Sequence, residues 1–144
     1  MKHLILFLLP LSLNAQYAGV RTNGIQMYVP ASSGLVSLTL TKEHDRKLAY
    51  VHYSESIKLN NFELFGGAGI HAGARLVTRF KQDAQSIFLA GFSAIGGMRY
   101  TLKRVVFQVD VTPRTDLPMF GGCEMHEYCK ESALPYSASL NIKL

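Results

Sequence analysis

The chain has 144 residues, of which 48% are hydrophobic and 17% charged, and 15 Lys and Arg against 10 Asp and Glu give a formal net charge of +5. This length fits one domain. The positive charges form no basic run and are not interleaved with aromatic residues, so the composition does not indicate a protein that binds nucleic acid.

The first fifteen residues are typical of a signal peptide for the general secretion pathway. A short basic start precedes the apolar stretch 4–9, and Ala15 is a small residue suited to cleavage. The apolar stretch is shorter than the roughly 20 residues that a transmembrane helix needs. We therefore expect a signal peptide over 1–15 and a single domain over 16–144, with a buried N-terminal helix as the alternative.

The rest of the chain is dominated by an alternation of apolar and polar residues. Side chains on a strand point alternately to opposite faces, so this pattern predicts a sheet with one apolar and one polar side. In chain order, the segments that show it are 17–22, 24–30, 34–42, 47–57, 61–75, 86–103, 104–112 and 133–144. The first two are shorter than the 9–11 residues of a membrane-spanning strand, which predicts either a low wall on that side or a first strand that begins at Gln16.

The connections between these segments fall into two sets of different length. Odd-numbered connections are 23–24, 43–46, 76–85 and 113–132, and even-numbered ones are 30–33, 58–60 and 103–104. If the first strand starts in the periplasm, both long loops face outward and the short turns face the periplasm, as in bacterial outer-membrane barrels with an even number of strands. We therefore predict an all-β fold, an eight-stranded antiparallel up-and-down transmembrane β-barrel in the outer membrane.

The polar face is predicted to fill the lumen. In lipid a sheet must close on itself, because unpaired backbone groups are not tolerated, and eight strands leave an interior just wide enough for side chains. The charged residues of this face are Arg21, Glu63, His71, Arg75, Arg99, Asp110, Lys103 and Lys143. We expect the first six to form a lumenal polar network without an open pore. The alternative is a soluble periplasmic barrel of opposite polarity, with an apolar lumen for a small hydrophobic ligand.

His52, Ser54 and Glu63 share the polar face of a predicted hairpin. A base beside a serine, oriented by a carboxylate, is the arrangement used in acyl transfer. The His-x-Ser pair is similar to that of the outer-membrane lipid A deacylases, in which an Asn usually follows the Ser, whereas Glu55 follows here. A lipid A-modifying acyl hydrolase is therefore one alternative function, and polar filling of the lumen is the other interpretation of these residues.

Cys123 and Cys129 are the only cysteines and lie in the longest predicted loop. In an oxidising compartment they are expected to form a disulfide. Glu124, His126 and Glu127 lie between them and leave a zinc site as the alternative, although the spacing matches no standard site. We expect no metal and no cofactor.

Three segments resemble small Gram-negative outer-membrane barrels of the OmpA/OmpX type. The run Gly66–Gly73 is similar to a Gly-x-Gly-x-His-x-Gly strand of these barrels, Gly91–Tyr100 follows it, and Val105–Arg114 contains the Asp-x-x-Pro found at the end of their seventh strand. The resemblance implies insertion by the barrel-assembly machinery, which reads a final aromatic residue where this chain has Leu144. Most members of this family have no assigned activity.

From these patterns we expect a structural or surface-interaction role. Outer-membrane lipids would surround the barrel, and the loops 76–85 and 113–132 would contact an extracellular ligand or protein. In such a molecule the loops carry recognition while the barrel holds them in place.

Overall fold

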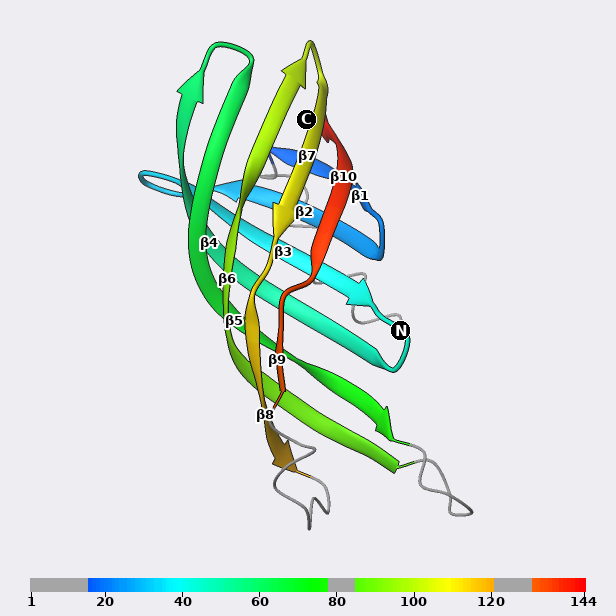
Figure 1. Ribbon diagram of the computed structural model, residues 1–144. Coiled ribbons are helices and arrows are strands. Elements are labelled where there is room, and N and C mark those ends of the chain that lie inside the picture. Colours follow the sequence, from blue (N-terminus) through cyan, green and yellow to red (C-terminus); the bar gives the residue numbers. More distant parts are fainter. Residues whose placement is uncertain (1–15, 78–84, 121–130) are drawn as a thin grey trace.

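The computed structural model describes residues 16–77, 85–120 and 131–144, and these form an all-β, closed, eight-stranded antiparallel barrel (Figure 1). The strand segments are β1 (Tyr17–Arg21), β2 (Gly24–Pro30), β3 (Leu35–Lys42), β4 (Arg46–Leu59), β5 (Phe62–Val77), β6 (Gln85–Leu102), β7 (Val105–Val111), β8 (Arg114–Phe120), β9 (Glu131–Ala133) and β10 (Tyr136–Lys143). The predicted all-β barrel with eight strands is thereby confirmed.

The barrel closes through the pairing of β1 with β10. From β1 to β6 each strand pairs with the next one along the chain. β6 then pairs with both β7 and β8, β7 pairs with β10, and β8 pairs with β9. Thus β7 with β8, and β9 with β10, are two barrel strands that are each interrupted once.

Prolines account for both interruptions. Pro113 separates β7 from β8, and Pro135 separates β9 from β10. Proline has no backbone N–H and cannot donate to the sheet. Two backbone bonds carry the sheet across the break, since Thr112 N donates to the Pro135 carbonyl over 2.8 Å and Ala94 N donates to the Pro113 carbonyl over 2.9 Å.

The prediction that a loop begins at Pro113 is wrong. Arg114 and the residues after it resume pairing with β6, from Ser93 opposite Arg114 onward. The alternation of inward and outward residues continues beyond the proline, because one proline removes only one donor. The other predicted strand boundaries agree with the structure within two residues. The predicted signal peptide and residues 78–84 and 121–130 of the predicted loops lie outside the described residues.

The short turns lie at the same end of the barrel, which we call the short-turn end (Figure 1). It holds the 31–34 turn, the Asn60–Asn61 turn and the Lys103–Arg104 turn. Asn60 and Lys103 have φ angles of 58° and 56°, which allow two-residue turns. The chain also begins and ends its barrel strands here, with Leu144 N donating to the Gln16 carbonyl over 3.0 Å.

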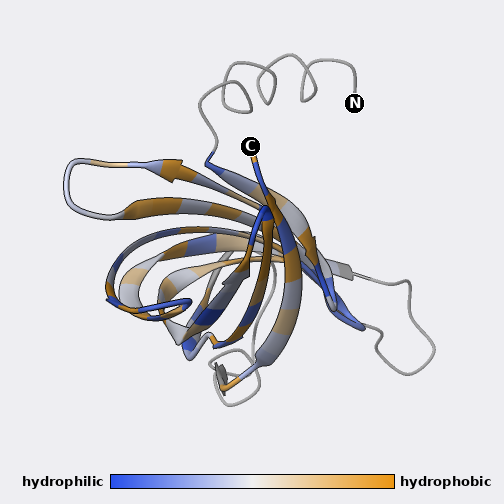
Figure 2. Ribbon diagram, turned by 90° about the horizontal axis from the view of Figure 1, so that it is seen from above, coloured by the Kyte–Doolittle hydropathy of each residue, from blue (hydrophilic) through white to orange (hydrophobic). Residues whose placement is uncertain are grey.

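The polarity of the barrel is the reverse of that in a water-soluble protein. Hydrophobic and hydrophilic residues alternate along the strands (Figure 2). Among the described residues, buried polar and charged side chains outnumber buried hydrophobic ones, while large hydrophobic side chains cover the outside. No helix in the described part of the chain has the length and apolar character needed to cross a bilayer.

Candidate functional site

Arg99 is the centre of a first group of lumenal side chains. It is 1% exposed, and its Nε donates to Gln108 Oε1 over 2.9 Å while its Nη1 donates to Glu63 Oε1 over 3.1 Å. The guanidinium carbon also lies 3.8 Å from the ring centroid of Phe65 and 4.7 Å from that of Tyr28. Hydrogen bonds therefore hold the edge of the guanidinium and aromatic rings contact its faces.

The chain of bonds continues from Gln108 to Asp110. Gln108 Nε2 donates to Asp110 Oδ2 over 2.7 Å, and Arg21 Nη2 donates to Asp110 Oδ1 over 3.0 Å. We call Arg21, Glu63, Arg99, Gln108 and Asp110 the Arg99 cluster. Its two arginines balance its two carboxylates, and four of its members were expected in the lumenal network from the sequence.

A second group is built around Asp116, which is 1% exposed. Asp116 Oδ1 accepts a hydrogen bond from His71 Nε2 over 2.7 Å and lies 3.3 Å from Arg114 Nε, and Asp116 Oδ2 accepts from Arg46 Nη1 over 2.5 Å. Arg114 in turn donates from Nη1 and Nη2 to the two carboxylate oxygens of Glu43, each over 2.7 Å. We call Glu43, Arg46, His71, Arg114 and Asp116 the Asp116 cluster.

Two ion pairs of the Asp116 cluster cross the lumen, that of Arg46 with Asp116 and that of Arg114 with Glu43. β4 and β8 are separated in the sheet by β5 and β6, so the pair of Arg46 with Asp116 cannot form along the wall. The hairpin of β1 and β2 ends where Thr22 N donates to the Ala138 carbonyl, well before the long strands end (Figure 1). The low wall expected from these short strands is thus present, and the ion pairs join β8 to β4 across the lumen near it.

The remaining predicted network member, Arg75, is connected to the Asp116 cluster through Asp45 and has a side chain that is 29% exposed. Its Nε donates to Asp45 Oδ2 over 2.6 Å, and Asp45 Oδ1 lies 3.4 Å from Arg46 Nε. Partial burial acts to raise the pKa of the Asp45 carboxyl, but the hydrogen bond from Arg75 and the charges of both arginines outweigh it and hold this pKa below its ordinary value of 3.8. Asp45 is therefore an anion that fixes the turn between β3 and β4.

Two lysines that the alternation assigned to the lumen are exposed instead. Lys103 lies in the turn between β6 and β7, and Lys143 is the last residue of β10. Both are at the short-turn end, where the wall no longer encloses a lumen. Their side chains are open to solvent because they lie at the rim of the barrel, where the neighbouring strands end.

The candidate catalytic residues do not come together. His52 Nε2 lies 2.8 Å from Ser93 Oγ on β6, whereas Ser54 Oγ donates to the Leu35 carbonyl over 3.4 Å. Glu63 is bonded to Arg99, and the register places it opposite Lys58, six residues along β4 from His52. The partner of His52 is therefore a serine that sequence reasoning missed, across β5 on the same inward face.

Tyr50 links the histidines of this region. Its ring stacks on His52 with centroids 5.5 Å apart and planes at 19°, and it lies 5.4 Å from the ring of His71. Tyr50 Oη accepts a hydrogen bond from Arg114 Nη1 over 2.5 Å. The pair of His52 and Ser93 is thereby packed against the Asp116 cluster, an arrangement that rigidifies the middle of the lumen.

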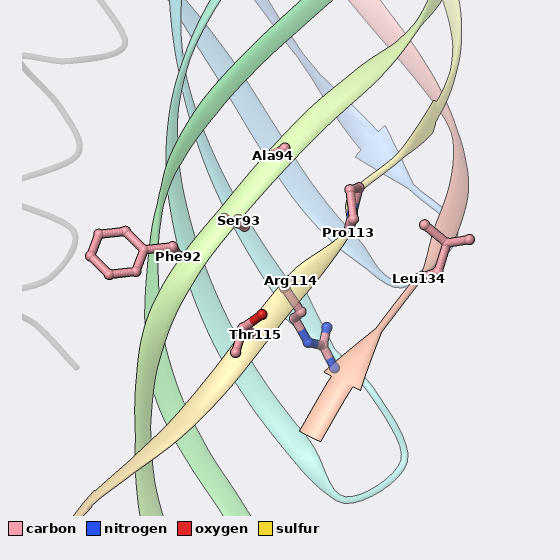
Figure 3. A pocket seen from close by; sticks show the side chains of 7 residues that line it. All are labelled: Phe92, Ser93, Ala94, Pro113, Arg114, Thr115 and Leu134. Carbon is pink, nitrogen blue, oxygen red and sulfur yellow. The ribbon is translucent and has the colours of Figure 1, made fainter. Parts of the chain in front are cut away.

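Two recesses open on the outer face on either side of Phe92. One, of about 570 Å³, lies at the proline interruption and is shown in Figure 3 with its lining residues, Phe92, Ser93, Ala94, Pro113, Arg114, Thr115 and Leu134. The other, of about 460 Å³, is lined by Ala49, Val51, Ile70, His71, Ala72, Ala90, Gly91, Phe92 and Leu117. Both recesses have a mainly apolar lining.

The predicted disulfide partners Cys123 and Cys129 lie outside the described residues. Within the described ranges, no group of three or more His, Cys, Asp or Glu side chains is arranged to hold a metal ion. Comparisons of the chain with protein-family models, with curated proteins and with solved structures find no match.

Proposed function

We propose that this protein is an outer-membrane β-barrel with a filled polar lumen, serving a structural or surface-interaction role through the connections opposite the short-turn end. The inverted polarity carries this proposal. Phe92 is 72% exposed, Val109 59% and Ile70 58%, all on the outer face. A monomer in water rarely exposes so continuous an apolar surface, whereas a bilayer requires one.

The ion pairs in the lumen support the proposal that the barrel holds its loops in fixed positions. Each cluster holds two arginines and two carboxylates that are bonded to one another. Such compensated pairs fill space and fix the relative positions of the strands across the lumen. A barrel stiffened in this way presents its loops from a fixed frame, in keeping with an OmpA/OmpX-like role.

The geometry gives less support to the two alternative functions. An acyl hydrolase built on His52, Ser54 and Glu63 lacks its carboxylate, because Glu63 is paired with Arg99. A soluble carrier of a small hydrophobic ligand needs its apolar face inside, and here that face is outside. A membrane barrel with a filled lumen needs an apolar outer face and a polar inner face, and the barrel has both.

Cell fractionation followed by gel electrophoresis tests the proposed location. We expect the protein in the outer-membrane fraction, with a faster band in unheated SDS that shifts after boiling. The shift is expected because the closed hydrogen-bonded sheet resists the detergent until it is heated. A protein recovered in the soluble fraction, with one band under both conditions, would overturn the proposal.

Val109→Arg tests whether the middle of β7 faces lipid. Arginine near the middle of a bilayer costs about 2 kcal/mol, and the cost falls toward zero near the headgroups. We expect this loss in the free energy of unfolding in phosphatidylcholine vesicles, measured by urea titration. Leu102→Arg, at the short-turn end, is the matched control and should change stability by less than about 1 kcal/mol. If neither substitution changes the free energy of unfolding, Val109 faces water and not lipid.

A further inference from the structure

We propose that the paired lysines Lys42 and Lys47, with the neighbouring 460 Å³ recess, form a binding site for an anionic membrane lipid. The phosphate of the headgroup lies at the lysines and one acyl chain lies in the recess. This inference rests on the proposed membrane location, and it adds a specific ligand class to the barrel wall.

The recess is a groove in the outer face with a defined floor and wall. Its floor is the row Ala49, Ala72 and Ala90, which the registers of β4, β5 and β6 place opposite one another, with Leu117 of β8 at the end. The adjoining wall is the row Val51, Ile70 and Phe92. These side chains are 43%, 58% and 72% exposed and project above the alanines. A volume of about 460 Å³ lies within the usual range of ligand pockets.

The groove has a suitable direction for a lipid chain. Barrel strands tilt by roughly 35–45° from the barrel axis. A row of residues that runs across the strands therefore descends obliquely along the wall. An acyl chain from the surrounding leaflet can enter such a groove without lying flat in the membrane plane, and the groove is continuous with the apolar outer surface.

The two lysines lie at the β4 end of this groove. Lys42 and Lys47 are directly opposite one another in the register of β3 and β4, and both are exposed. Lys47 also lies two residues before Ala49, so the two share the outer face. Like charges directly opposite each other on one face of a sheet are destabilising unless an anion lies between them.

The nearby carboxylates are already bonded to the arginines of the lumen and its rim. Both oxygens of Glu43 bind Arg114, and the two oxygens of Asp45 face Arg75 and Arg46. In the part of the chain that the structure describes, neither Lys42 nor Lys47 forms an ion pair. The lysine pair therefore has positive charge to offer to a phosphate beside an apolar groove, which is the charge complementarity expected for an anionic lipid.

Fluorescence quenching by brominated lipids tests the site. The chain has no Trp, so Phe92→Trp provides a single indole at the edge of the groove. The full-length protein is reconstituted into phosphatidylcholine vesicles that contain a minor fraction of either brominated phosphatidylglycerol or brominated phosphatidylcholine. We expect the anionic lipid to quench with an apparent association constant about fivefold or more above that of the zwitterionic lipid, since each lysine near an anionic headgroup contributes about fivefold.

Matched variants in the Phe92→Trp background separate the two parts of the site. Lys42→Gln with Lys47→Gln should bring the ratio of the two apparent association constants, phosphatidylglycerol to phosphatidylcholine, close to one. Ala72→Leu fills the floor of the groove and should weaken quenching by phosphatidylglycerol. Arg104→Gln with Lys143→Gln removes the same charge at the short-turn end and should leave the preference intact.

The outcomes distinguish this site from the proposed membrane location. Quenching by neither lipid would mean that Phe92 does not face a bilayer, and the proposed location would fail together with the site. Equal quenching by both lipids would leave the location standing and overturn the lipid site. A preference that survives loss of both lysines, or that is lost equally in the control, would also overturn it.

Discussion

Asp116→Ala is expected to lower the free energy of unfolding by about 3–5 kcal/mol. Asp116 is 1% exposed and its two carboxylate oxygens contact Arg46, Arg114 and His71. Its removal leaves two arginines in the lumen with one partner fewer, and a charge buried without compensation is far more costly than the net stabilisation gained from an intact pair.

Urea titration of the refolded protein in phosphatidylcholine vesicles, read out by the gel mobility of the folded form, measures this effect. Glu43→Gln is the matched control, because Glu43 binds the same arginine from a side chain that is 23% exposed. Water can hydrate the Arg114 guanidinium where the charge of the Glu43 carboxylate is lost. We therefore expect a loss of about 1–2 kcal/mol in the free energy of unfolding. If Asp116→Ala costs no more than Glu43→Gln, water reaches the lumen and the Asp116 cluster does not depend on burial.

The alternation of the sequence predicts most of the strands and their faces, although it does not predict β8 after Pro113. A side chain's parity decides whether it points inward, so the sequence alone assigns Arg21, Glu63, Arg99 and Asp110 to the lumen. The lengths of the connections predict which end of the barrel carries the short turns and which end carries the long connections. The parity of a side chain and the length of a connection can each be read from a short stretch of sequence, so a local pattern is enough to predict them.

Alternation does not reveal which inward residues meet. The sequence does not predict the Asp116 cluster, because its pattern places Glu43 in a turn and both Arg114 and Asp116 in a loop that begins at a proline. Partners across the lumen also depend on the register of several strands at once. The pair of His52 and Ser93 illustrates this, since two strand pairings separate its members.

The failure of the predicted catalytic group has a simpler cause. In a hairpin closed by the Asn60–Asn61 turn, Lys58 must lie opposite Glu63, and each further step along β4 increases the distance to Glu63. His52 is six such steps away and lies opposite Gly69. Sharing a face is therefore a weaker criterion than the register that the turn already implies.

Gly69→Ala should destabilise the barrel by about 3 kcal/mol, at the upper end of what overpacking usually costs. Gly69 faces the lumen on β5, where a Cβ would lie 1.9 Å from the carbonyl oxygen of Val51 and 2.7 Å from the Cα of His52. These are backbone atoms of β4 and cannot move aside as a flexible side chain would. The methyl group can be accommodated only if β4 shifts, which disturbs the paired lumenal side chains behind it.

Gly66→Ala, three residues earlier on the same strand, is the matched control. Gly66 faces outward, and a Cβ there would come no closer than 4.0 Å to the carbonyl oxygen of Ile95. Alanine restricts the unfolded chain more than glycine does, so this substitution should be neutral or stabilise by about 0.4–1 kcal/mol. Urea titration of both variants in the same vesicles compares them. A similar loss in both would mean that β5 needs glycine for a general backbone reason, whereas a loss confined to Gly69→Ala would show that close approach of β4 and β5 sets the spacing of the lumen.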